Sequence, residues 1–519
     1  MNTDQLAFNC PPSHASPKDL CKFFVPSMRG PTKSAFKSIM ANPMLTMINM
    51  AGGMPNPNTF PILQLQARVK APGAISSQPE DTLTIENKWR NKTTECLDEL
   101  LQYSGGCGLE SYCNFLYNHT QRTHSPQYTD WGVIASCGNT DAIDKALSLF
   151  CQPGDSVLVE RWTFPGTLSK LAIARVNPVP VALDEEGMVP ADLDRVCSGW
   201  GGATPLRVLY VIPTGQNPTG TTMSLVRRKS IYAVAQKHNL VIIEDDPYYF
   251  LQLPKFTSSQ GYDIVTDRTC GQQQALFSSL LSLDTDGRVI RLDSFSKILA
   301  PNLRCGWVTA PRYILDKIQI LNETTTLQPS GLSQGLVSKL LNDTWGMDGW
   351  DAHICELRAI YTARRNHFVR MAEKHLSGLV KYTVPLAGMF MWMRVNFGAA
   401  SADPTAMTRL LYKMNECGIM MAPGMPFSST ATLPSDHYLR AAFGLVDIDM
   451  FEPALLRLAH AINTISGQPA SVDDEAATND ASCSSSKNEI RAYVANNTDK
   501  VQLIAPIGFN NVAVVNSHS

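Results

Sequence analysis

The sequence predicts an α/β fold in which helices cover a large, mostly parallel sheet. Four short apolar and β-branched runs recur along the middle of the chain: DSVLVE, RVLYVIP, LVIIEDD and RVIRLD. Segments with helical periodicity separate them, such as TDAIDKALSLF, in which Ile143, Ala146, Leu147 and Phe150 share one face. Strands that alternate with helices indicate βαβ units and therefore parallel strands.

Size and composition narrow the class of protein. The chain has 519 residues, enough for two or more domains. Its 44 Lys and Arg nearly balance 46 Asp and Glu, which argues against nucleic acid or an anionic membrane as a partner. Its 13 cysteines lack metal-type spacing, so we expect a reduced intracellular protein without a metal site. No secretory signal or membrane-spanning run is found, which predicts a cytoplasmic enzyme.

Shifts in composition divide the chain into four predicted parts. Residues 1–95 are expected to form an N-terminal arm and part of a small domain. Residues 96–344 form the large sheet domain, in which a polar insertion at about 251–287 predicts a surface excursion between two strands. In residues 345–467, helices around the β segment GMFMWMRV predict a smaller α+β domain. Residues 468–519 are acidic at first and rich in Ser, Ala and Asp, which predicts a disordered tail.

Polar residues follow the predicted strands, at the edge where open α/β sheets bind ligands. RVLYVIP is followed by TGQNPTG, which presents Asn217. RVIRLD is followed by SFSK and then Arg304. The small-residue turn SCGNTD precedes the amphipathic helix, where backbone amides would meet an anion. After LVIIE, the segment DDPYYF presents Asp245, Asp246, Tyr248 and Tyr249.

These groups together fit pyridoxal 5′-phosphate, the cofactor that accepts electrons from amino-acid carbanions. Lys297 suits covalent attachment as a Schiff base, and Asn217 and Tyr249 suit the phenolic oxygen. An acid such as Asp246 suits a ring nitrogen that must stay protonated. From the residues alone, the neighbouring Asp245 could equally face the cofactor.

The chain resembles the fold-type I pyridoxal-phosphate aminotransferases over roughly residues 18 to 465. Within them it is most similar to the fungal aromatic aminotransferases and the related kynurenine/2-aminoadipate aminotransferases. The resemblance implies a seven-stranded, mostly parallel large-domain sheet and a smaller α+β domain. Its motifs stand in the family's order: AGGMPNPNTFP, LQYSGGCGLE, GNTDA, PTGQNPTG, EDDPYYFL, DGRVIRLDSFSKILAPNLRCGW and GMFMW.

The resemblance implies a role for each matching position around the cofactor. Lys297 would carry the Schiff base, and Tyr249 and Asn217 would bond the 3′-oxygen. Asp246, three residues before Tyr249, would pair with the pyridinium nitrogen, which leaves Asp245 a structural role. Phe164 would stack on the cofactor ring, without the hydroxyl of the tyrosine often found there. The expected phosphate ligands are Ser294, Ser296, Arg304, Asn139 and Thr140.

The resemblance also implies how the substrate and a second subunit take part. Arg440 would clamp the substrate α-carboxylate, a bidentate task that lysine performs poorly. Asn217, Gly53 and Phe390 would line the substrate pocket. Tyr103 would reach the phosphate of the neighbouring subunit, which implies a homodimer.

The implied reaction is ping-pong transamination of an aromatic L-amino acid, with 2-oxoglutarate or another 2-oxo acid as acceptor. Lys297 would move the proton from Cα. No second arginine for a distal carboxylate can be identified. Because the related enzymes tend to be broad, kynurenine and 2-aminoadipate stay open as alternative donors.

Two other classes of protein are alternatives. The fold also hosts pyridoxal-phosphate decarboxylases, C–S lyases and cyclases; Arg440 argues against decarboxylation, since it would anchor the carboxylate that must leave. A transcription regulator with an aminotransferase-like sensor is disfavoured, because the match begins near residue 18 and leaves no room for a winged-helix domain. The filled cofactor positions also disfavour a catalytically dead relative.

Overall fold

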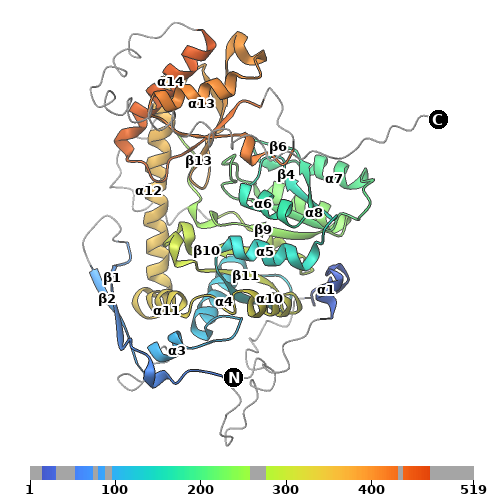
Figure 1. Ribbon diagram of the computed structural model, residues 1–519, viewed down its shortest axis with the longest axis vertical. Helices are drawn as coiled ribbons and strands as arrows, with labels where there is room; N and C mark the ends of the chain where they lie inside the picture. Colours follow the sequence, from blue (N-terminus) through green and yellow to red (C-terminus); the bar gives the residue numbers. More distant parts are fainter. Residues whose placement is uncertain are drawn as a thin grey trace, which may run out of the picture.

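A seven-stranded sheet forms the centre of the molecule (Figure 1). Strand β11 is antiparallel to its neighbours β3 and β10, and all other neighbours are parallel. The four strands predicted from the sequence are present, which confirms the mostly parallel sheet. In spatial order the strands are β3 (Trp131–Ser136), β11 (Gly306–Pro311), β10 (Val289–Ser294), β9 (Val241–Asp245), β8 (Val208–Val211), β4 (Ser156–Glu160) and β5 (Asn177–Val181). The structure is a computed structural model that describes residues 15–30, 53–73, 80–87, 96–257, 276–430 and 436–467.

Helices cover both faces of the sheet (Figure 1). Successive residues of a strand point into different cores. Ile243 of β9 packs in the core on the side of α5, and Ile242 packs in the core on the side of α8. Because both faces are covered, the strands are apolar along most of their length. The first group is α5 (Asn139–Phe150), α6 (Pro165–Ile173) and α10 (Arg312–Thr325), and the second is α4 (Glu110–His124), α7 (Pro190–Ser198) and α8 (Leu225–Lys237).

Helix α5 brings its N-terminus to the carboxyl edge of the sheet. The helix follows Gly138, whose φ of +84° suits glycine far better than a residue with a side chain. The apolar face predicted from the sequence is confirmed, because Ile143, Ala146, Leu147 and Phe150 are all buried in the core between α5 and the sheet.

A second, antiparallel sheet of four strands lies in the C-terminal part of the described chain. It packs against α13 (Ala406–Glu416) and α14 (Phe451–Ser466) around a separate apolar core. The exact domain boundaries expected from the sequence stay predictions. The strands, in spatial order, are β12 (Val380–Tyr382), β13 (Phe390–Val395), β15 (Tyr438–Ala442) and β14 (Ala422–Pro423).

The long helix α12 (Gly346–His375) runs beside both sheets (Figure 1). Near its start, Trp350 and Ile354 are buried in the core of the large sheet. Near its end, Phe368 and Ala372 are buried in the core of the small one. One helix therefore has side chains in both cores.

The described residues before position 96 include a hairpin that the sequence did not predict. Strands β1 (Gln64–Lys70) and β2 (Glu80–Glu86) are antiparallel, and Leu83 and Ile85 pack against α3 (Leu97–Leu101) and α11 (Gly331–Lys339). Neither strand joins the four-stranded sheet. The expectation that this segment forms part of the small domain is therefore not supported by its described residues.

The predicted insertion at about 251–287 is only partly a surface excursion. On either side of residues 258–275, which are outside the described residues, Leu251, Leu253, Leu280 and Leu281 are fully or almost fully buried. Two of them are tied to β9, because the Leu280 and Leu281 amides donate to the Glu244 carboxylate at 2.7 and 3.1 Å. The tail at 468–519 also lies outside the described residues.

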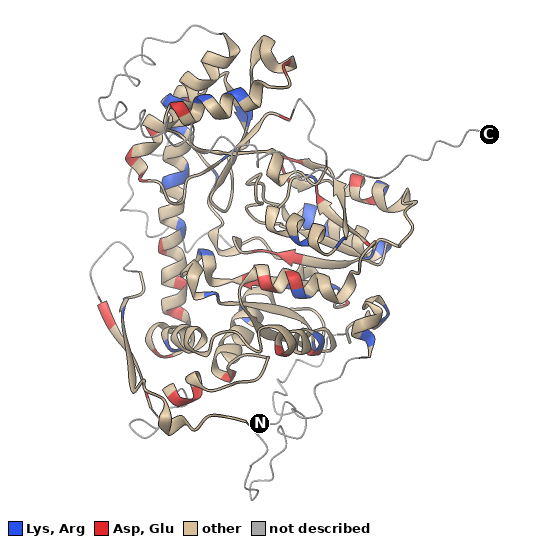
Figure 2. Ribbon diagram, viewed as in Figure 1, with Lys and Arg blue, Asp and Glu red and all other residues tan. Residues whose placement is uncertain are grey.

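Charge and hydropathy of the described elements agree with the composition. Acidic and basic residues are interspersed over both sheets and their helices (Figure 2). Among the helices that the structure describes, none combines the length and the apolar character needed to cross a membrane.

Candidate active site

Lys297 lies in a tight turn at the carboxyl end of β10. The strand ends at Ser294, whose hydroxyl accepts a hydrogen bond from the Ser296 amide at 3.1 Å and starts the 3₁₀ turn Phe295–Lys297. Lys297 is half-buried, and burial lowers the pKa of its ammonium group, helped by the positive charges of Arg440 and Arg304. A lysine with a lowered pKa is the more ready nucleophile and base.

Arg304 and the start of α5 form an anion-binding cup. Arg304 donates to the Ser296 hydroxyl at 3.2 Å and to the Cys137 carbonyl at 2.8 Å. Its guanidinium lies so close to Gly138 that a Cβ there would overlap it. Thr140 follows in the first helical turn, where backbone amides and the helix dipole favour an anion. The structure therefore brings together Ser296, Arg304 and Thr140 of the residues predicted to bind phosphate, whereas the side chain of Asn139 donates to Asp245 instead.

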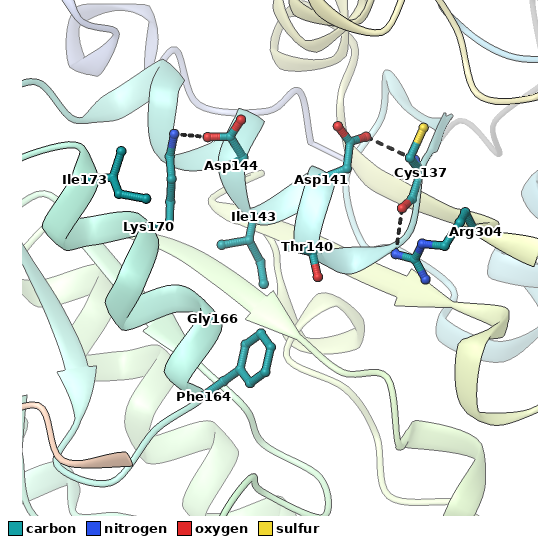
Figure 3. A pocket seen from close by; sticks show the side chains of 10 residues that line it. All are labelled: Cys137, Thr140, Asp141, Ile143, Asp144, Phe164, Gly166, Lys170, Ile173 and Arg304. Atoms are coloured by element: carbon teal, nitrogen blue, oxygen red, sulfur yellow. Dashed lines mark hydrogen bonds and ion pairs between the residues drawn. The ribbon is translucent and has the colours of Figure 1, made fainter. Parts of the chain in front are cut away.

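A pocket of about 520 Å³ adjoins this cup (Figure 3). The Phe164 ring forms one wall, across from Thr140 and Arg304. Phe164 directly precedes α6, and Pro165 at the first helical position fixes that start. Lys170, farther along α6, pairs with Asp144 at the outer end of the pocket. The ring of Phe164 is thus placed to cover a flat group bound at the cup.

Asp245 and Asp246 point to opposite faces of the sheet, because successive strand residues alternate. Asp245 lies on the α5 face, where Asn139 donates to it at 2.7 Å and the Tyr210 hydroxyl at 2.6 Å. Burial raises the pKa of the Asp245 carboxyl, and these two hydrogen bonds oppose the rise.

Asp246 belongs to a buried ionic network on the other face. It accepts from Thr214 and from Arg291, both at 3.1 Å, and Arg291 also pairs with Glu244 and Asp293. The geometry therefore does not support the expected role of Asp246 at the ring nitrogen. Asp245, which shares a hydrogen bond with the first residue of α5, lies on the side of the cup.

The neighbouring tyrosines divide in the same way. Tyr248 packs edge-on against Phe390, with ring centroids 5.7 Å apart, and Arg440 acts on its pKa. Tyr249 lies under Arg291 at 4.6 Å and against His124 at 4.7 Å, within the opposite network. Tyr248 is therefore the tyrosine near Arg440, and the expected assignment to Tyr249 is not supported.

Arg440 projects from β15 toward the large domain. It donates to the Asn217 side-chain oxygen at 2.7 Å, so these two predicted site residues meet. Its guanidinium lies between the rings of Phe390 and Phe427, 4.2 and 4.7 Å from their centroids. Its Nε is buried without a partner among the described residues. A carboxylate arriving here would find a guanidinium that the two rings hold in place.

Replacing Phe427 with leucine tests this arrangement. Loss of one ring face should raise the KM for every amino-acid substrate about 3- to 30-fold, the range of a partly desolvated cation–π contact, with little change in kcat. Phe451→Leu is the matched control, because Phe451 is equally buried and lies under Arg364, away from the site. Equal KM values in the two variants would show that the Phe427 ring has no part in substrate binding.

Glu160 is a fully buried carboxyl group at the end of β4. It accepts hydrogen bonds from the Ile212 amide at 3.2 Å and from the Gln216 side chain at 2.9 Å, and so supports the turn that carries Asn217. Burial raises its pKa to about 8.

The raised pKa of Glu160 predicts a pH-dependent stability. Both the folded and unfolded states are protonated below the ordinary pKa near 4.5, so no penalty exists there. Between that value and about 8 the unfolded state loses its proton first, and stability falls as pH rises. Glu160→Gln should therefore raise the Tm of the apoprotein more at pH 8.5 than at pH 5. Thermal unfolding at both pH values checks this, and a pH-independent difference would contradict it.

Two predicted site residues lie apart from this group in the single chain. The side chain of Tyr103 is 59% exposed, and Gly53 is exposed with no atom near its missing Cβ. Their roles at a neighbouring subunit and in the substrate pocket stay predictions. The metal prediction also stays open, although the described residues contain no cluster suited to a metal ion.

The donor set fits pyridoxal 5′-phosphate. The Arg304 cup suits the phosphate, and Asp245 suits the ring nitrogen. Asn217 and Tyr248 suit the phenolic oxygen. Lys297, whose Nζ has no hydrogen bond among the described residues, suits the aldehyde carbon. Sequence reasoning placed Tyr248 at this edge of the sheet but gave it no role, and it missed Phe427. The alternation of side chains along β9 is the signal that could have selected the tyrosine, but no sequence signal points to Phe427.

Comparisons with known proteins identify the family of this chain. The model of the family "Aminotransferase class I and II" matches residues 87–455. An aromatic amino acid aminotransferase of Schizosaccharomyces pombe is 33% identical over 467 residues, 86% of this chain and 98% of its own. The mitochondrial kynurenine/alpha-aminoadipate aminotransferase of Bos taurus is 30% identical, over 82% of this chain and 93% of its own.

A solved structure shows the same fold. The crystal structure of aminotransferase Aro8 from Candida albicans superposes with a TM-score of 0.81 at 31% identity, covering 87% of this chain and 100% of that one. The predicted fold class is confirmed. The chain belongs to the class I and II aminotransferase family.

Proposed function

We propose that the protein is a pyridoxal-phosphate-dependent aminotransferase that converts an aromatic L-amino acid to its 2-oxo acid, with 2-oxoglutarate or another 2-oxo acid as acceptor. One observation carries the proposal: two arginines with different surroundings, Arg440 and Arg304, both act on the pKa of the Lys297 amine. Arg304 belongs to the anion cup, and Arg440 is held by Asn217 and two rings. Such a lysine lies between a phosphate site and a carboxylate site.

Each residue has a distinct task in the proposed reaction. Arg440 binds the substrate α-carboxylate and, with Asn217, fixes the orientation of Cα. Lys297 Nζ removes the Cα proton and returns a proton in the reverse half-reaction. Asp245 places a negative charge beside the ring nitrogen, which keeps that nitrogen protonated. When bound, pyridoxal phosphate supplies the electron-accepting ring that stabilises negative charge at Cα.

The aromatic preference is supported by the walls beside Arg440. Phe390 and Tyr248 meet edge to face, and both rings are buried. Aromatic pairs of this kind accept a further ring without leaving polar groups unpaired. The relative named for aromatic amino acids points the same way, whereas the bovine relative keeps kynurenine and 2-aminoadipate as the second candidate donors.

The test uses the two half-reactions separately. Purified protein with bound cofactor is titrated with Phe, Tyr, Trp, kynurenine and 2-aminoadipate while the cofactor absorbance is followed. We expect an aromatic amino acid to convert the cofactor to its amine form, and 2-oxoglutarate to reverse the change. If the cofactor binds but no amino acid gives an amine form that a 2-oxo acid reverses, the reaction would instead belong among those of the lyases or cyclases.

The remaining sequence expectations stay proposals. A homodimer would give Tyr103 a role, and its exposed side chain is available for a contact with a second subunit. A cytoplasmic location also stays a prediction.

A further inference from the structure

We infer that Tyr210 is a positioning residue that holds the Asp245 carboxylate in place and keeps it ionised. This inference rests on the proposed function, in which Asp245 is the partner of the cofactor ring nitrogen. Tyr210 lies on β8, beside β9, and its side chain is fully buried. Its hydroxyl donates to Asp245 Oδ2 at 2.6 Å.

Asp245 is fixed from two sides. Asn139, at the start of α5, donates to its Oδ1 at 2.7 Å and also to the Leu292 carbonyl at 3.1 Å. Tyr210 holds the other oxygen. With one donor on each oxygen, the carboxylate plane cannot rotate without breaking a hydrogen bond. The remaining lone pairs are left for a donor that enters from the site.

The Tyr210 hydroxyl also favours the ionised form of Asp245. Burial favours the neutral acid, and after burial the Tyr210 hydrogen bond is the largest influence on the Asp245 pKa, followed by Asn139 and Arg291, all acting to lower it. Glu160, at the end of β4 beside β8, adds little opposing negative charge, because burial favours its neutral form. Without the hydroxyl, Asp245 would lose its strongest support as an anion.

The phenol of Tyr210 keeps its proton and donates a hydrogen bond to Asp245. Burial and the nearby Asp245 charge raise its pKa well above the ordinary value, so the proton stays on Tyr210. The hydrogen bond is therefore a neutral donor on a charged acceptor, a contact stronger than one between neutral groups. Tyr210 acts on the cofactor only through Asp245.

The chain offers a matched control for this tyrosine. The Tyr232 hydroxyl of α8 also lies within hydrogen-bond distance of two carboxylates, that of buried Asp284 at 3.0 Å and that of half-buried Asp286 at 2.8 Å. Those aspartates precede β10 and lie at the opposite edge of the sheet from Lys297. Tyr232→Phe therefore removes a similar hydrogen bond at a place with no route to the cofactor.

The experiment compares Tyr210→Phe and Tyr232→Phe as holoenzymes. We expect Tyr210→Phe to lower kcat roughly 10- to 100-fold, the worth of a hydrogen bond to a charged group, and to weaken binding of pyridoxal phosphate to the apoprotein. Tyr232→Phe should change neither. Equal kinetics and equal cofactor affinity in the two variants would overturn the inference.

Reconstitution with N1-methyl pyridoxal phosphate separates positioning from general damage. Its ring nitrogen carries a permanent positive charge, so no proton needs to be held there. With this cofactor, the kcat of wild type should exceed that of Tyr210→Phe by no more than about threefold. This is well below the ratio expected with pyridoxal phosphate, where the lost hydrogen bond lowers kcat. A ratio that stays the same would mean that Tyr210 is merely structural.

A double variant covers the case in which Tyr210→Phe folds poorly. Tyr210→Phe combined with Asp245→Asn no longer leaves a carboxylate unpaired, and it should be as active as Asp245→Asn alone. A further tenfold loss would contradict action through Asp245. If wild-type protein binds no cofactor at all, the proposed function fails instead, so the two failures are distinguishable.

Discussion

Replacing Lys297 with alanine is expected to lower kcat/KM for transamination by more than about 10⁴-fold, the upper range for loss of a general base. Burial lowers the pKa of the Lys297 amine, and the positive charges of Arg440 and Arg304 lower it further. The variant loses both the covalent attachment and the group that moves the Cα proton. Single-turnover absorbance measurements with a saturating aromatic amino acid check the result.

Two controls sharpen this test. Lys170→Ala removes another lysine from the outer end of the adjoining pocket, where it pairs with Asp144, and should retain activity within a few-fold of wild type. A small primary amine in solution should restore part of the Lys297→Ala activity, because it can take over the proton transfer. Unchanged turnover in Lys297→Ala would remove Lys297 from the mechanism.

Asp245→Asn is expected to reduce kcat about 10²- to 10³-fold, as for loss of one preorganised electrostatic group. Asparagine keeps the shape and can still accept from Tyr210, but it carries no charge to keep a ring nitrogen protonated. Asp246→Asn should retain activity within about tenfold and mainly lower the Tm, because it breaks an ion pair with Arg291 that is fully buried.

The pair of variants decides between the two aspartates. Steady-state kinetics and thermal unfolding are measured on both holoenzymes. If Asp246→Asn abolished turnover while Asp245→Asn did not, the assignment made from strand pleating would be wrong and the one made from motif spacing would be right.

The sequence predicted the sheet and the site's edge well, for physical reasons. The strands of this sheet are covered on both faces, so their apolar runs stand out. The hairpin Gln64–Glu86 was missed because its strands are largely exposed, and only alternate residues such as Leu83 and Ile85 are buried. Polar residues dominate such a strand, and its period-2 signal is weak.

The motif spacing could not decide which of two adjacent residues faces the site. Asp245 precedes Tyr248 by three positions, and Asp246 precedes Tyr249 by the same number, so spacing fits both pairs. Only the strand pleat separates them, since a shift of one residue moves a side chain to the other face. Phe390 was expected in the substrate pocket, but the second ring beside Arg440 was unpredictable, because Phe427 lies far from Phe390 in sequence and meets it only through the tertiary fold.

The single helix α12 connects the core of the large sheet to the core of the small sheet. Its 30 residues span about 45 Å at about 1.5 Å per residue. Along its length, Arg358 donates to the Gln252 carbonyl and Arg365 to the carbonyls of Pro254 and Pro385, each at 2.7 Å. A rotation of only about 5° at the Trp350 end would sweep the far end through about 4 Å, more than the length of a hydrogen bond. Trp350 lies against the ring of Phe295, in the turn that carries Lys297, while the far end of α12 packs in the core of the sheet that carries Arg440. A change of packing around Trp350 would therefore alter the distance between Lys297 and Arg440.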